Sequence, residues 1–117
     1  MIHTVLIVED EDELRESMRD ALEFNGYAVV ATQEGKEALD ELVRIEHVCL
    51  VLLDLLMPGM NGWEFYNKMR ARREYDDVPV VVHTSAPSRA PFGVTRILSK
   101  PLEITRLLSV VREYCVQ

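Results

Sequence analysis

The sequence predicts an α/β fold with a single doubly wound parallel sheet and helices on both of its faces. Short apolar segments rich in β-branched residues alternate with segments whose apolar residues recur at helical spacing. This order is typical of parallel strands joined by crossover helices. Residues 48–53 (VCLVLL) form an unbroken apolar run, and a strand without polar alternation is expected to be buried on both faces.

The first half of the chain contains three expected strands and two expected helices. The strands are residues 5–8, 27–31 and 48–53. The first helix is marked by apolar residues at positions 14, 18, 21 and 22, and Asn25-Gly26 is expected to stop it. The second helix is expected to begin near Glu34 and is marked by apolar residues at positions 38, 39, 42 and 43.

The second half begins with a Pro-Gly loop at residues 57–62, and we expect a third helix over residues 63–73. Residues 79–82 predict a fourth strand that ends near Thr84, and residues 95–99 a fifth. The last helix is marked by apolar residues at helical spacing, namely Ile104, Leu107, Leu108, Val111 and Cys115.

The connection between the fourth and fifth strands is irregular. It is the ten-residue segment SAPSRAPFGV, with prolines at 87 and 91 and a glycine at 93. Because an interior proline costs a helix about 3 kcal/mol, we expect at most one helical turn here. One face of the sheet should then be thinly covered near Val80, Val82 and Ile97. Such an apolar patch would be a candidate partner surface or homodimer surface.

Composition limits the function classes. The chain has 117 residues, and we expect residues 1–117 to form one domain. Its net charge of −7, from 20 acidic and 13 basic residues, argues against binding to nucleic acid or to anionic lipid. No basic n-region precedes an apolar stretch, and no run approaches the roughly 18 apolar residues of a membrane span. We therefore expect a cytoplasmic protein without membrane insertion.

The two cysteines, Cys49 and Cys115, have neither CxxC nor histidine spacing around them, so a zinc site is not expected. Their spacing leaves a disulfide open. We expect two reduced, buried side chains instead, as is common for free cysteine.

Polar side chains follow four of the expected strands at their carboxyl ends, where open parallel sheets bind ligands. They are Glu9 and Asp10, then Asp54, then Thr84 with Ser85 beside it, and finally Lys100. Clustered carboxylates need a compensating cation, and Mg²⁺ prefers oxygen ligands. We expect Asp10 and Asp54 to bind Mg²⁺ directly. Glu9, directly or through a water, and the backbone carbonyl of Leu56 complete the expected ligand set.

Asp54 is the expected nucleophile because it ends the most buried strand. A carboxylate can attack phosphorus and form an aspartyl phosphate. Lys100 is expected to place a positive charge on the phosphoryl group, and Thr84 to donate a hydrogen bond to it.

Residues 54–62 (DLLMPGMNG) are close to the D-x-x-M-P-x-M-[DN]-G loop of the receiver domains of two-component response regulators. With Glu9-Asp10, Thr84 and Lys100-Pro101 at the other signature places, the chain resembles this family over essentially its whole length. It is similar to the stand-alone chemotaxis response regulator. The resemblance implies a flavodoxin-like receiver fold with strand order 2-1-3-4-5. It also implies Mg²⁺-dependent phosphorylation of Asp54 by a histidine kinase, a phosphotransfer protein or a small phosphodonor.

The chain also departs from the family pattern. The family usually has a helix between strands four and five. It often has an aromatic residue three positions before the lysine, where this chain has Ile97. His83 alternates with Thr84 along its strand, so we expect it to face the opposite side as a packed or partly exposed residue.

Three functions stay open at this point. The first is a phosphorylatable switch that acts through protein–protein contacts, which the acids, Thr84 and Lys100 favour. A pseudo-receiver, acting as a constitutive interaction module, is favoured by the missing helix and by Ile97. An aspartyl-phosphate phosphatase is disfavoured, because Leu56 and Ala86 stand where a water-orienting polar side chain is needed.

Overall fold

The computed structural model describes residues 3–57 and 59–115. Its strands are β1 (Thr4–Val8), β2 (Ala28–Thr32), β3 (Val48–Asp54), β4 (Val80–Thr84) and β5 (Arg96–Ser99). Its α-helices are α1 (Asp12–Phe24), α2 (Gly35–Arg44), α3 (Gly62–Arg70) and α4 (Ile104–Tyr114). Across the described residues, the parallel strands form a five-stranded sheet in the order β2-β1-β3-β4-β5. The predicted fold class and strand order are confirmed.

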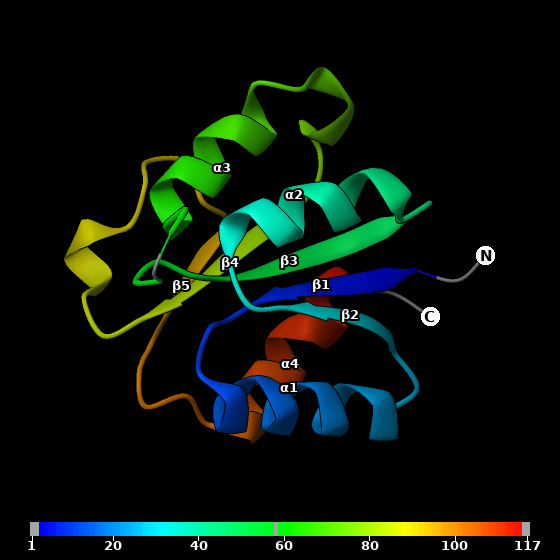
Figure 1. The fold of residues 1–117 in the computed structure, drawn as a ribbon. Coiled ribbons are helices and arrows are strands. Elements are labelled where there is room, and N and C mark those ends of the chain that lie inside the picture. Colours follow the sequence, from blue (N-terminus) through cyan, green and yellow to red (C-terminus); the bar gives the residue numbers. More distant parts are fainter. Residues whose placement is uncertain (1–2, 58, 116–117) are drawn as a thin grey trace.

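Helices cover both faces of the sheet. Figure 1 shows α2 and α3 on one face and α1 and α4 on the other. The side chains of β3 alternate between the two layers: Leu50 and Leu52 pack toward α1 and α4, whereas Val51 and Leu53 pack in the cluster that includes Phe65 of α3. This double burial explains why the sequence of β3 shows no polar alternation.

Local signals set the helix ends. Helix α1 stops at Asn25, whose side-chain amide donates to the Ala21 carbonyl. Glu34 caps α2 by accepting from the Glu37 N–H. None of the helices in the described part of the chain is long and apolar enough to cross a membrane.

Helix α3 is shorter than predicted: it ends at Arg70 rather than at residue 73. The Arg70 guanidinium donates to the carbonyls of Tyr75 and Val78, at 2.6 and 2.9 Å. These bonds hold the segment after the helix against Arg70, the last residue of α3. A short 3₁₀ turn, η1 (Arg73–Tyr75), follows.

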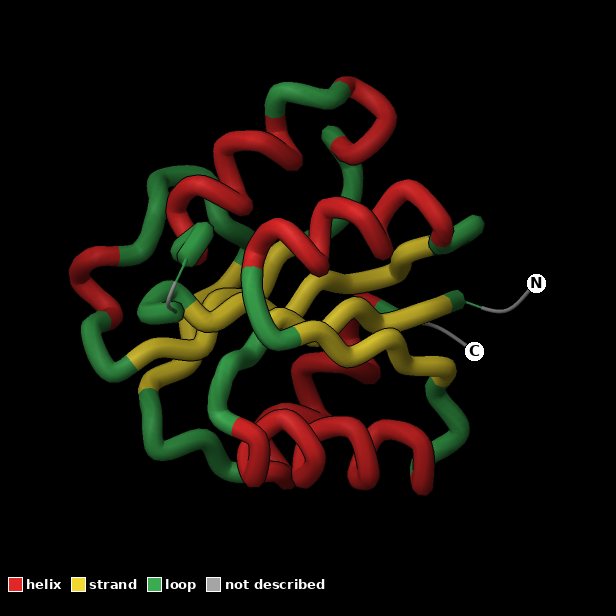
Figure 2. Tube along the Cα trace, in the orientation of Figure 1, coloured by secondary structure: helices red, strands yellow, loops and turns green. Residues whose placement is uncertain are grey.

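The β4–β5 connection contains one 3₁₀ turn, η2 (Pro87–Arg89), visible in Figure 2 as the short helical segment between these strands. The prediction of at most one turn is confirmed. The predicted exposure is correct for Ile97, which is 41% exposed, but wrong for Val80 and Val82, which are fully buried. Both valines belong to the cluster of α3, and two residues of the connection itself, Ala90 and Val94, pack against that cluster.

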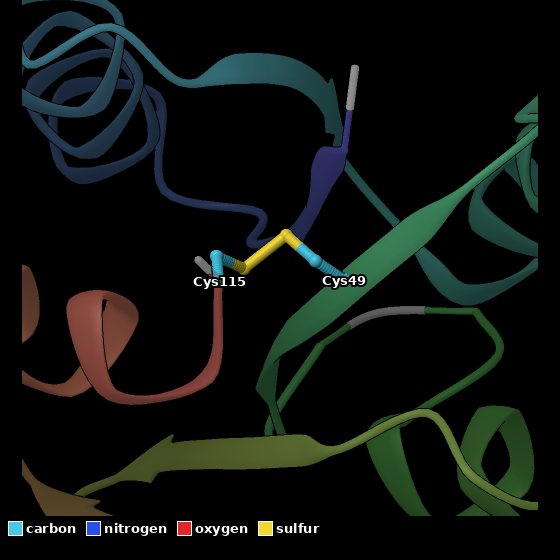
Figure 3. Close-up of a disulfide and its surroundings, with 2 residues drawn as sticks. All are labelled: Cys49 and Cys115. Atoms are coloured by element: carbon cyan, nitrogen blue, oxygen red, sulfur yellow. A yellow bond between two sulfur atoms is a disulfide. The ribbon is translucent and has the colours of Figure 1, made fainter. Parts of the chain in front are cut away.

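The expectation of two reduced cysteines is wrong. Cys49, on β3, and Cys115, just after α4, form a disulfide with Cα atoms 5.4 Å apart (Figure 3). Both side chains are buried. The two cysteines are 66 residues apart in sequence, so only the tertiary fold brings them together. A crosslink of this span restricts the unfolded chain and stabilises the fold by up to about 4 kcal/mol in the chain-entropy estimate.

Candidate functional site

Three carboxylates meet at the carboxyl edge of the sheet. Glu9 and Asp10 follow β1, and Asp54 ends the neighbouring strand β3. Each carboxylate offers an oxygen, and these oxygens lie within 4.8 Å of one another. Glu9 and Asp54 are buried, and Asp10 is half-buried. The site is therefore a compact set of hard oxygen donors.

Lys100 reaches this cluster from the segment after β5. Its Nζ lies 3.1 Å from Glu9 Oε1 and 3.4 Å from Asp54 Oδ2. Its backbone N–H donates to the Thr84 carbonyl at 2.8 Å, which fixes the start of the side chain next to β4. One ammonium group thus bridges two carboxylates.

His83 lies in the same cluster, which the sequence argument did not predict. It is buried and faces the opposite side from Thr84, as expected, but Glu9 occupies that same side. His83 Nε2 lies 2.9 Å from Glu9 Oε1. Asp54 and His83 are directly paired in the β3–β4 register. The sequence signal for this contact was that His83 lies level with Asp54 on the neighbouring strand.

The loop after β3 is held by close backbone contacts. The Leu56 N–H donates to Asp54 Oδ1 at 3.3 Å, and the Gly62 N–H donates to the Leu55 carbonyl at 3.0 Å. A Cβ on Gly62 would lie 2.6 Å from the Asp54 carbonyl oxygen. Only glycine lets α3 begin this close to Asp54. Pro58, in the middle of the loop motif, lies outside the described residues.

Thr84 is buried at the end of β4, whereas Ser85 is exposed. Its hydroxyl oxygen accepts a hydrogen bond from the Ala86 N–H at 3.0 Å. Strand β4 ends at Thr84, as the sequence predicts.

Arg15 is a second residue that sequence reasoning missed. Its guanidinium donates to the backbone carbonyls of Glu9 and Asp10, at 3.0 and 3.4 Å, and to the Asp12 carboxylate at 2.6 Å. These bonds fix the loop that carries the first two acids. The acidic residues on both sides of Arg15 in the sequence do not indicate this role.

Burial and shared charge set the protonation of the site. Burial and the charge of Glu9 raise the pKa of Asp54 to about 7, against the smaller opposing effect of Lys100. Burial alone would raise the pKa of Glu9, but hydrogen bonds from His83 and the Glu11 N–H hold that pKa well below its ordinary value. The nearby carboxylates outweigh the burial of Lys100 and raise its pKa. The metal-free site therefore contains a charged Glu9 beside an Asp54 that readily keeps a proton.

Burial also lowers the pKa of His83, so its ring is neutral near pH 7. A neutral ring that bonds to a carboxylate must donate from Nε2. Nδ1 then carries a lone pair, and this atom has no hydrogen-bond partner within the described residues. His83 thus gives Glu9 a hydrogen bond without adding charge.

A comparison with known protein families identifies the family of this chain. Residues 5–112 match the model of the response regulator receiver domain. The chain belongs to this family. Receiver domains are signalling domains of two-component systems that interact with histidine kinases and phosphotransfer proteins, and the family binds Mg²⁺ at an acidic pocket.

Individual relatives agree. The chain is 36% identical to the response regulator MprA of Mycolicibacterium vanbaalenii over 92% of its length, but it spans only 48% of that protein. It is 30% identical to the polar-differentiation response regulator DivK of Brucella ovis, with 97% of each chain covered. The structure of the chemotaxis response regulator CheY4 of Vibrio cholerae superposes with a TM-score of 0.86 at 26% identity, covering 98% of this chain and all of that one.

Proposed function

We propose that this chain is a phosphorylatable signalling switch and that Asp54 accepts the phosphoryl group. The observation that carries the proposal is the position of Asp54: it ends the central buried strand, beside Glu9 and Asp10, with the Lys100 ammonium 3.4 Å from its carboxylate. We assign residues 1–117 as a whole to the receiver domain, because its sheet and helices run from Thr4 to Tyr114.

The donor set fits Mg²⁺, which prefers carboxylate, carbonyl and water oxygens. Asp10 and Asp54 would hold the ion directly. Glu9 would act through a water, because both of its oxygens already accept hydrogen bonds. The carbonyl of Leu56, whose N–H lies beside Asp54, would complete the protein ligands. When bound, the ion supplies positive charge to the oxygens of the incoming phosphoryl group.

In the transfer step, one Asp54 carboxylate oxygen forms a bond to phosphorus. With phosphohistidine as donor, the P–N bond breaks, and its electron pair stays on the imidazole nitrogen, which then takes a proton from solvent. With acetyl phosphate, the P–O bond breaks and acetate leaves. Asp54 attacks as the carboxylate, so only its deprotonated form takes part in the transfer.

Lys100 and Thr84 are assigned to the phosphoryl oxygens. The Lys100 ammonium offsets the negative charge that the phosphoryl group brings. The Thr84 hydroxyl accepts from Ala86, which leaves its own proton to donate to a phosphoryl oxygen.

The partners are proposals as well. We assign a histidine kinase or phosphotransfer protein as donor, and a downstream protein of unknown identity as the target. Ile97 of β5 and Phe92 of the β4–β5 connection are exposed, and this part of the molecule is the candidate contact surface for that target or for a homodimer.

Labelling with acetyl phosphate and Mg²⁺, followed by intact mass measurement, tests the proposal. Wild type is expected to gain one phosphoryl group, and EDTA and Asp54→Asn are each expected to abolish the gain. Asp20→Asn, at an exposed acid of α1, is the matched control and should label like wild type. Equal labelling of wild type and Asp54→Asn, or none of wild type, rejects the proposal.

A further inference from the structure

Glu9 depends on hydrogen bonds from three separate segments. The Glu11 N–H donates to Oε2 at 3.0 Å, whereas Lys100 Nζ and His83 Nε2 lie 3.1 and 2.9 Å from Oε1. The Glu9 side chain is fully buried. A buried carboxylate is stable only while such partners remain, because it has lost its hydration.

The two side-chain partners of Oε1 differ in what else they can do. Lys100 is 22% exposed and already contacts Asp54. His83 is 1% exposed and lies on β4 with Val81 on the same face. β3 runs between β1 and β4, so the His83–Glu9 bond crosses the end of the strand that carries Asp54. Lys100 is free to change partners, and His83 is not.

Phosphorylation of Asp54 would make Lys100 change partners. The phosphoryl group adds negative charge to Asp54, and the nearest ammonium is attracted to its oxygens. Lys100 would then leave Glu9 Oε1. Without another donor, Glu9 Oε1 would then be buried with no hydrogen bond. The free-energy cost of that unpaired oxygen would oppose phosphorylation.

We propose that His83 is a positioning residue that keeps Glu9 in place while Lys100 turns from Glu9 to the phosphoryl group on Asp54. The inference rests on the proposed function of Asp54. His83 touches neither the reacting oxygen nor the phosphorus; it acts through Glu9. Its Nε2 lies 2.9 Å from Glu9 Oε1, and its burial holds the ring there while Lys100 moves.

Substitutions that separate the hydrogen bond from the volume of the ring test the proposal. His83→Leu removes the donor, and His83→Gln retains an N–H at a similar reach. At saturating Mg²⁺, the maximal phosphorylation rate with acetyl phosphate is expected to fall about tenfold in His83→Leu and to stay within about threefold of wild type in His83→Gln. Val81→Ala, a packing change on the same strand and face, should keep the wild-type rate. A wild-type rate in His83→Leu, or equal losses in His83→Leu and His83→Gln, overturns the inference.

A measurement on the unmodified chain covers the case in which His83→Leu does not fold. Long-range ¹H–¹⁵N spectra of labelled wild type report which ring nitrogen carries the proton. We expect Nε2 of His83 to be protonated in the free protein and to remain so, hydrogen-bonded, after addition of Mg²⁺ and beryllofluoride as a phosphoryl analogue. A change of tautomer or loss of that bond in the beryllofluoride state overturns the inference.

The outcomes separate the two proposals. If wild type takes up no phosphoryl group, the proposed function of Asp54 fails. If wild type is phosphorylated and the His83 variants behave like wild type, only the role of His83 fails.

Discussion

The centre of the sheet and its β5 edge are built differently. In β3 every residue after Val48 is buried, and the strand has helices on both faces. In β5 only Leu98 is buried, and Ile97 is 41% exposed. The acids of the candidate site follow the central strands β1 and β3, whereas the edge strand contributes Lys100 alone.

The two regions differ in how precisely their residues must be positioned. Carboxylates that share one ion or one ammonium must be held within narrow limits, which densely packed strands provide. The edge is less constrained, so a crossover can shorten to a single 3₁₀ turn there without loss of the sheet. The helix that the family usually has between strands four and five is reduced to the turn η2 in this chain.

One contact links the two regions. The indole N–H of Trp63, in the first turn of α3, donates to the Arg89 carbonyl of η2 at 2.8 Å. The Arg89 guanidinium lies 5.1 Å from the centre of the same indole ring. The loop that follows Asp54 is thus tied, through α3, to the connection that follows Thr84.

The largest effect is expected where α3 approaches the backbone of Asp54. Gly62→Ala would place a methyl group 2.6 Å from both the Asp54 carbonyl oxygen and the Leu55 Cα. Because these are backbone atoms, we expect the free energy of unfolding to fall by about 3 kcal/mol. Urea denaturation in EDTA measures this. Ser88→Ala on the exposed η2 turn is the control and should change little. Equal stability of Gly62→Ala and wild type would show that α3 tolerates a methyl group against the backbone of Asp54.

Much of the fold could be predicted because its signals are local. The unbroken apolar run of β3, the Asn25-Gly26 stop and the prolines of the β4–β5 connection each act within a few residues. The approach of Glu9, Asp54 and Lys100 followed from one rule, that the carboxyl ends of parallel strands share an edge.

The remainder depended on contacts between distant segments. Whether Val80 is covered depends on how α3 and the connection pack, and the Cys49–Cys115 disulfide depends on where α4 ends relative to β3. The partner of His83 lies 74 residues away in sequence. Alternation fixed the face of this histidine but not the residue it meets there.

A medium effect is expected from the charge of Asp54. The pKa of this carboxyl is about 7 in the folded chain, against an ordinary value of 3.8. Between these values the unfolded chain is ionised while the folded chain keeps the proton, so this group's contribution to stability is lost as pH rises from about 4 to 7. Asp54→Asn removes the ionisable group and therefore this loss of stability at higher pH. In EDTA at pH 8 we expect this variant to be about 2 kcal/mol more stable than wild type, with the difference shrinking towards pH 4.

Denaturation curves at several pH values check this expectation. Asp20→Asn, at an exposed position of α1, is expected to show no such trend. A stability difference between Asp54→Asn and wild type that does not vary between pH 4 and 8 would mean that the site does not hold Asp54 in its protonated form.

The smallest effect on stability is expected at the edge. Phe92 is fully exposed, so Phe92→Ser removes almost no buried area, and the free energy of unfolding should change by less than about 0.5 kcal/mol. Leu53→Ala in β3, by contrast, should cost about 2–5 kcal/mol. Phosphorylation of Phe92→Ser by acetyl phosphate should proceed at the wild-type rate, because among the described residues Phe92 belongs neither to the two buried clusters nor to the acidic set. A loss of stability or of phosphorylation in Phe92→Ser would show that the edge supports the site, and the division between a rigid centre and a variable edge would then fail.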